Sequence, residues 1–175
     1  MTEGKRAARG APAVQAPTEF EAAALKAALT ARPGKSAVKN EHRSRIAVRA
    51  AHKFLASVGL DAELRPDEPN AHRWDYGLGL IDRHAKESAW WVEPHPASST
   101  GEVSTMLAKL DWLRAKLASH GFKGLRRLTD EAQRKGIAFR WLATSGDICI
   151  RPGSSHARRL ALGGLAAPSR HIALP

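Results

Sequence analysis

Cysteine is almost absent from this chain of 175 residues, in which Cys149 is the single one. A lone cysteine cannot form an internal disulfide, and zinc clusters built on paired Cys-x-x-Cys ligands need more thiolates than the chain has. Cys149 stands in the apolar run 147–150, so we expect a small buried side chain rather than a nucleophile.

Long apolar runs are also missing. No segment approaches the roughly 20 uninterrupted apolar residues of a membrane-spanning helix. The first ten residues, MTEGKRAARG, lack the apolar run of a signal peptide. We therefore expect a cytoplasmic protein with no membrane partner. Because 43% of the residues are hydrophobic, the chain can still bury a core, which excludes a wholly disordered basic protein.

Acidic residues are few relative to basic ones: 17 Asp and Glu stand against 28 Lys and Arg, giving a formal net charge of +11. Arg supplies 18 of these cations. Its planar guanidinium binds phosphate oxygens with two hydrogen bonds and stacks on bases. The charge balance therefore predicts that the protein binds nucleic acid, either DNA or RNA. The alternative is a basic protein that binds a different kind of partner.

The composition divides the chain into two parts. Residues 1–17 consist of Ala, Gly, Pro, Lys and Arg with little to bury, so we predict a disordered basic arm. Residues 18–175 have a length typical of one domain.

Helical spacing of apolar residues appears in several segments. It predicts helices from Thr18 to about Ala31, from about Ser36 or Asn40 to Val58, from about Gly101 to Ser119, and from about Ser154 to before Gly163. The basic segment 122–135 has a partly helical pattern, and residues 61–70, with two prolines, are predicted to form a linker or a short edge segment.

Alternation of apolar and polar residues predicts strands at 74–81 and 89–95, paired as an antiparallel hairpin, and two more at 138–143 and 147–150. Together these elements predict an α/β (α+β) domain with a mixed central β-sheet flanked by helices.

Three side chains of the hairpin could carry chemistry. Asp75 lies between Trp74 and Tyr76, while Glu93 and His95 share one strand face because they are two residues apart. Glu93 interrupts an apolar strand, where an unpaired carboxylate is costly to desolvate, so a cation or an Arg partner is expected. His95 lies between two prolines, which suits a ligand or base and equally a hydrogen bond that ends the strand.

These residues resemble the PD-(D/E)XK nuclease superfamily, the restriction-endonuclease-like fold. Its core is a helix, a β-meander, a crossover helix and a further strand, with an Asp at the second strand and an acid-x-Lys triplet on the third. Asp75 matches the Asp, and Glu93-Pro94-His95 matches the triplet, with His95 in place of Lys. The resemblance covers roughly residues 36–150.

The resemblance implies a metal-dependent nuclease in which Asp75 and Glu93 hold Mg²⁺ or Mn²⁺. It further implies that His95 orients or deprotonates the attacking water. In some relatives the long helix supplies the missing lysine, which makes Lys109 a second candidate for this role, with an ordinary solvated helix face as the alternative.

Two groups of cations are candidates for gripping the nucleic-acid backbone, with a solvated outer face as the alternative for the first: Arg43, Arg45 and Arg49; Lys123, Arg126 and Arg127. The rival function is a non-catalytic module of similar fold that binds nucleic acid or a protein and has lost the metal site. A missing motif lysine is what this rival predicts.

Overall fold

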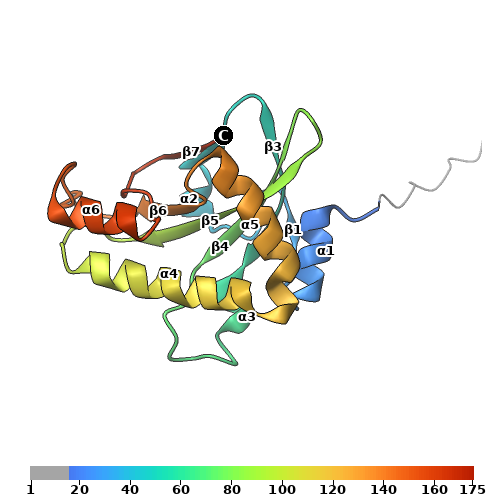
Figure 1. Cartoon of the computed structure of the whole chain (residues 1–175), viewed down its shortest axis with the longest axis horizontal. Coiled ribbons are helices and arrows are strands. Elements are labelled where there is room, and N and C mark those ends of the chain that lie inside the picture. Colours follow the sequence, from blue (N-terminus) through green and yellow to red (C-terminus); the bar gives the residue numbers. More distant parts are fainter. Residues whose placement is uncertain (1–15) are drawn as a thin grey trace, which may run out of the picture.

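The computed structural model describes residues 16–175, and a five-stranded mixed sheet lies at its centre in the order β1-β3-β4-β5-β6 (Figure 1). The predicted α+β class is thus confirmed. The strands of this sheet are β1 (Arg32–Pro33), β3 (His52–Gly59), β4 (Tyr76–Asp82), β5 (Glu87–His95) and β6 (Phe139–Ala143). A second, parallel sheet consists of β2 (Ile46–Val48) and β7 (Ile172–Leu174).

Helices cover one face of the large sheet, with α4 and α5 crossing it (Figure 1). The helices are α1 (Glu19–Lys26), α2 (Asn40–Arg43), α3 (Leu60–Leu64), α4 (Glu102–Ala118), the 3₁₀ helix η1 (His120–Phe122), α5 (Lys123–Lys135) and α6 (Ser155–Leu162). The apolar stripe that predicted α4 is buried, from Val103 to Leu117. In the described part of the chain no helix has the length and apolarity to cross a bilayer.

The opposite face of the sheet packs on the small β2–β7 sheet. Its side chains include Leu78, Trp90 and Leu142, which contact Ile46 and Ile172 in a second apolar cluster. Because both faces are covered, the central strands are apolar on both sides, and a polar group placed there has little access to water.

The chain path is a meander followed by a crossover. β3 pairs antiparallel with β4, and β4 pairs antiparallel with β5. The chain then runs through α4, η1 and α5 before β6 adds parallel to β5. The predicted hairpin and the predicted strand at 138–143 are therefore confirmed.

Two glycines in β4 make room for the packing above it. A Cβ on Gly77 would lie 2.7 Å from the ring of Trp91, and one on Gly79 would lie 2.5 Å from the ring of Phe20. Trp91 is fully buried and donates from Nε1 to the hydroxyl of Thr129 on α5 at 2.8 Å. It is therefore part of the core and not a surface for stacking on a base.

The helix predicted from about Ser36 or Asn40 to Val58 is wrong. This segment contains the four-residue helix α2, then β2 and β3. Residues 52–59 pair along the whole of β4 through a bulge between Phe54 and Ala56. That pairing with a distant strand outweighs the local helical spacing of the apolar side chains.

The strand predicted at 147–150 is also wrong. The outer edge of β6 already bears segment 165–169, through bridges from Phe139 to Leu165 and from Leu142 to Ser169. Residues 147–150 are left without a strand partner, and the Cys149 side chain is exposed rather than buried.

The first described helix begins as predicted and ends earlier. Thr18 caps α1, with the reciprocal bonds of a capping box to Glu21, but the helix stops at Lys26 instead of Ala31. Most of the predicted basic arm, residues 1–15, lies outside the described residues. The predicted helix at 154–163 and the helical part of 122–135 are confirmed as α6 and α5.

Candidate active site

Asp75 immediately precedes β4, and Glu93 lies on the neighbouring strand β5. Tyr76, the first residue of β4, pairs with Val92 in β5, which puts Asp75 beside Glu93 at the next position of the ladder. The backbone amide of Asp75 donates to Oε2 of Glu93 at 2.7 Å. The structure therefore places the two acidic residues that the sequence singled out next to each other.

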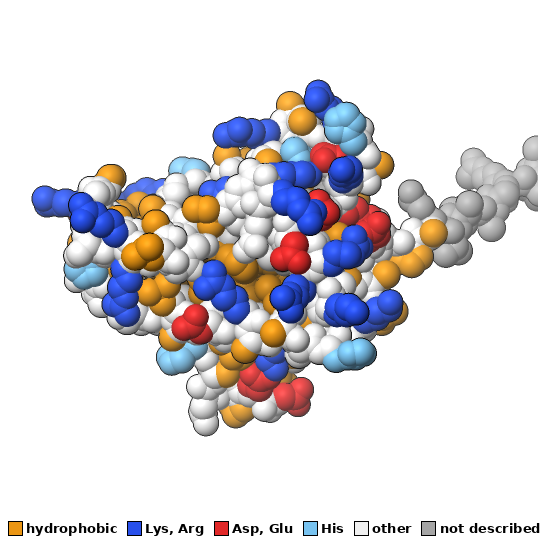
Figure 2. Space-filling model, viewed as in Figure 1, with side chains coloured by type: hydrophobic (Ala, Val, Ile, Leu, Met, Phe, Trp, Pro, Cys, Tyr) orange, Lys and Arg blue, Asp and Glu red, His pale blue; other side chains and the backbone are white. Residues whose placement is uncertain are grey.

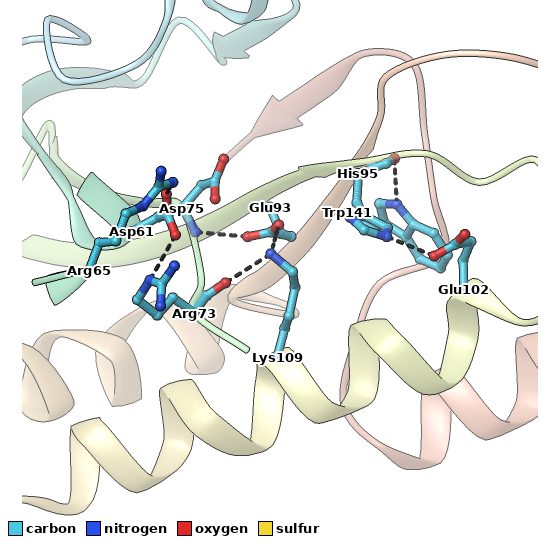
Figure 3. A network of polar contacts seen from close by, with 9 residues as sticks. All are labelled: Asp61, Arg65, Arg73, Asp75, Glu93, His95, Glu102, Lys109 and Trp141. Carbon is cyan, nitrogen blue, oxygen red and sulfur yellow. Dashed lines mark hydrogen bonds and ion pairs between the residues drawn. The ribbon is translucent and has the colours of Figure 1, made fainter. Parts of the chain in front are cut away.

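Lys109 joins them from the covering helix α4 (Figure 3). Its Nζ lies 2.5 Å from Oε1 of Glu93 and donates to the backbone carbonyl of Arg73 at 2.8 Å. Its side chain is 16% exposed, so the ammonium is held between a strand and the loop before β4. We call these three residues, the two acidic residues Asp75 and Glu93 together with Lys109, the acidic trio site.

Burial dominates the electrostatics of this site. The Glu93 side chain is 1% exposed, and its burial, together with the nearby Asp75 carboxylate, raises the pKa of Glu93 to about 8 despite the opposing effect of Lys109. Burial also raises the pKa of Asp75. Neighbouring carboxyl groups with raised pKa values are typical of functional sites, because burying them costs desolvation free energy.

The two carboxylates differ in how they are satisfied. Both oxygens of Glu93 have partners, whereas the Asp75 carboxylate has no hydrogen bond or ion pair with any residue in the described range 16–175. Figure 3 shows it turned to the other side from Lys109. A ligand shared by both carboxylates requires the Asp75 side chain to rotate toward Glu93.

The loop before β4 supports Lys109. Arg73, 9% exposed, pairs with Asp61 on α3 at 2.9 Å and donates to the carbonyl of Glu68. The Glu68 carboxylate in turn accepts from Nε1 of Trp112 at 2.7 Å and from Lys116, both on α4. The polar face of α4 is therefore packed against this loop and is not a plain solvated face.

His95 lies apart from the acidic trio site. Its Nε2 is 2.7 Å from Oε2 of Glu102, in the first turn of α4, and its carbonyl accepts from Nε1 of Trp141 at 2.9 Å (Figure 3). The strand periodicity that placed His95 on the Glu93 face holds, but the side chain is engaged with another carboxylate.

Sequence reasoning missed three neighbours of the site. Arg73 and Asp61 hold the loop, and His42 on α2 is one of the charged or ionisable groups near Asp75. His42 is 8% exposed, its Nδ1 has no partner among residues 16–175, and burial lowers its pKa. No signal in the sequence connects His42 to Asp75, since the segment was assigned to a helix.

The first group of predicted phosphate-binding cations is largely occupied within the protein. The Arg43 guanidinium donates to the carbonyls of Val38 and Ser36, and that of Arg45 to the carbonyls of Arg170 and Ala143. These two arginines therefore tie loops together, because carbonyl oxygens at chain reversals need donors. Arg49 is exposed and has no side-chain hydrogen bond to a described residue.

The second group lies on α5. Lys123, Arg126 and Arg127 are exposed and line one hollow at the start of this helix. Arg127 also pairs with Glu19 at the start of α1.

The donor set of the acidic trio site suits a hard cation. Carboxylate oxygens are the protein ligands that Mg²⁺ and Mn²⁺ prefer, and Mg²⁺ commonly keeps several waters with one or two carboxylates. Within residues 16–175 no group of three or more His, Cys, Asp or Glu side chains is arranged to hold a metal ion. The two carboxylates fit an ion whose remaining ligands are water once the Asp75 side chain, which has no other partner among residues 16–175, turns toward Glu93.

Comparisons with known proteins provide no relative: family models, curated proteins and solved structures were searched, and none matches this chain.

Proposed function

We propose that this protein is a metal-dependent nuclease that hydrolyses phosphodiester bonds of nucleic acid. The observation that supports it is the meeting of Asp75, Glu93 and Lys109 at the junction of two strands and the crossover helix. This is the set of groups that the resemblance to PD-(D/E)XK nucleases implies, with the lysine supplied from α4. The order of strands and crossover helix agrees with the same resemblance.

In this proposal the carboxylates of Asp75 and Glu93 hold Mg²⁺ or Mn²⁺. A bound ion of this kind neutralises charge that develops on the phosphodiester and lowers the pKa of a bound water. Lys109, fixed by Glu93 and by the carbonyl of Arg73, orients the attacking water or donates a proton to the leaving oxygen. Burial of Glu93 keeps bulk water away from these groups and strengthens their interactions.

The charge of the chain supports nucleic acid as the substrate. A net charge of +11 attracts a polyanion, and Lys123, Arg126 and Arg127 on α5 present their cations to solvent.

The deciding experiment is cleavage by purified wild-type protein. We expect Mg²⁺ or Mn²⁺ to support hydrolysis of single- or double-stranded DNA or RNA, and EDTA to stop it. Substrates of each kind are incubated with either ion or with EDTA, and products are resolved on denaturing gels. Absence of chelator-sensitive cleavage for all four substrates would remove the nuclease function.

A binding module that has lost the metal site is the alternative, favoured by one observation. Both oxygens of Glu93 already have partners in the protein, and Lys109 supplies the opposite charge. Such a pair is self-sufficient without an ion. Salt-dependent binding of nucleic acid without cleavage by wild-type protein is the result that this alternative predicts.

The geometry distinguishes Lys109 from His95. We expect Lys109→Ala to lower the cleavage rate about 100-fold or more, which is the usual contribution of a general acid or base. His95→Ala should change it by less than about fivefold, because His95 contacts Glu102 and not the trio. Initial rates at saturating metal measure both. A larger loss of rate in His95→Ala than in Lys109→Ala would show that His95, and not Lys109, acts on the attacking water.

A further inference from the structure

A basic hollow lies between the end of α1, η1 and the first half of α5. It has a volume of about 750 Å³, and its lining includes Lys26, His120, Lys123, Arg126, Arg127 and Asp130. Figure 2 shows Lys and Arg side chains over α5 and beside α1, with Asp and Glu side chains among them. One acidic side chain, Asp130, stands among four Lys and Arg side chains of this lining.

The cations of the basic hollow are largely unpaired. Within residues 16–175 the side chains of Lys26, Lys123 and Arg126 form no hydrogen bond or ion pair, while Arg127 pairs with Glu19. Some cations elsewhere, such as Lys109 and Lys116, have carboxylate partners. Gathering unpaired like charges at one place costs electrostatic free energy, which an anionic ligand would remove.

The frame that carries these cations is tightly packed. A Cβ on Gly124 would lie 2.8 Å from the Cβ of Ala23, and one on Gly121 would lie 3.2 Å from the carbonyl oxygen of Lys26. The two helices therefore approach as closely as their backbones allow at these glycines. The backbone positions of Lys26 and Lys123 are therefore set by the packing of the two helices, which lowers the entropic cost of binding.

The lining also indicates which part of a nucleic acid it would contact. It contains no Trp, Tyr or Phe on which a base could stack, and its Lys and Arg side chains are of the kind that contact phosphates. Contacts of this kind position a strand without selecting its sequence.

We propose that the basic hollow binds the phosphate backbone of the nucleic-acid substrate several nucleotides away from the acidic trio site. The proposal rests on the proposed function in that it takes the same partner. Helix α4 separates Lys109 from the hollow: nine residues from Lys109 to Ala118 at 1.5 Å each span about 14 Å. With phosphates spaced 3.4 Å along a duplex, this is about four base pairs.

The test compares two double variants that change charge equally. Lys123→Gln/Arg126→Gln removes two cations from the basic hollow, and Arg32→Gln/Lys53→Gln removes one Arg and one Lys that are exposed and line no part of it. Binding of fluorescent 6-bp and 24-bp duplexes is measured by anisotropy in EDTA, which prevents cleavage, at several salt concentrations. Inorganic phosphate and a nucleoside monophosphate are the competitors, and thermal unfolding verifies folding.

We expect the hollow variant to lose about tenfold or more in affinity for the 24-bp duplex and its salt slope to fall by about 2, because two fewer phosphates are neutralised. The 6-bp duplex, about 20 Å long, is long enough to contact the hollow and should lose affinity by a similar factor. Equal losses in both double variants, or none, would overturn the proposal, and so would displacement of the long duplex by millimolar nucleoside monophosphate. Cleavage by wild type is scored separately, so a failed hollow and a failed nuclease function give different results.

Discussion

Glu93→Gln is expected to lower chelator-sensitive phosphodiester cleavage at least about 100-fold. The substitution keeps the shape of the side chain and removes the negative charge that would hold a divalent ion. Because Glu93 lies 2.5 Å from Lys109 and accepts from the amide of Asp75, the same change also loosens the lysine. Asp75→Asn should have a similar effect, while nucleic-acid affinity in EDTA should stay within about threefold of wild type.

The matched control for this experiment is Glu87→Gln, the same substitution at the other end of the same strand. Glu87 accepts hydrogen bonds from the backbone amides of Glu19 and Phe20, far from the acidic trio site. Rates are measured over a range of Mg²⁺ or Mn²⁺ concentrations, so that weakened ion binding and slowed chemistry are separated. Cleavage by Glu93→Gln at the rate of Glu87→Gln would contradict the role assigned to Glu93.

Much of this arrangement follows from local patterns in the sequence. The two-residue period of a strand predicted Glu93 on the face opposite Trp90 and Val92. In the structure Glu93 is buried there and paired with Lys109, as expected because an unpaired buried carboxylate is costly to desolvate. The apolar stripe of α4 predicted which face of the helix packs on the sheet, whereas Lys109 became a candidate only through the resemblance to the nuclease family.

The features that could not be predicted from the sequence depend on contacts between residues far apart in the chain. Residues 52–59 have apolar side chains at helical spacing, and only the ladder with β4 selects the strand. The same error hid His42, which α2 places near Asp75, and it made Arg43 and Arg45 look like a basic ridge. Arg73 pairs with Asp61 across a loop of eleven intervening residues, a contact that no local period encodes.

Lys109→Met is expected to destabilise the metal-free fold, and increasingly so at higher pH. The substitution leaves Glu93 buried with no opposite charge beside it, and breaking a buried ion pair in this way costs about 3 to 5 kcal/mol. Protonation of Glu93 relieves the cost at low pH. The loss should therefore be small at pH 5 and grow by about 1 kcal/mol by pH 9, one unit above the pKa of Glu93, with the full cost reached only at higher pH, where the wild-type pair is fully ionised.

The sign of this pH dependence comes from the pKa of Glu93, which burial raises to about 8 in the folded protein, above its ordinary 4.5. Between these two values the folded state binds the proton that the unfolded state has lost, so the free energy of unfolding falls as pH rises. Lys109 lowers the pKa of Glu93, so its removal raises that pKa further and extends the fall above pH 8. Urea unfolding in EDTA at pH 5, 7 and 9 measures the effect.

The double variant Glu93→Gln/Lys109→Met separates two contributions to the loss of stability. One is the loss of the ion pair, and the other is the loss of packing by the lysine side chain. It has no buried carboxylate to titrate at position 93, so its stability relative to Glu93→Gln should be nearly constant from pH 5 to pH 9. It should also recover more than half of the stability that Lys109→Met loses at pH 9, because an amide beside a thioether leaves no buried charge. If the free energies of unfolding of the single and double variants instead fall in parallel as pH rises, the pH dependence comes from other groups. That result would contradict the pairing of Glu93 with Lys109 in the folded state.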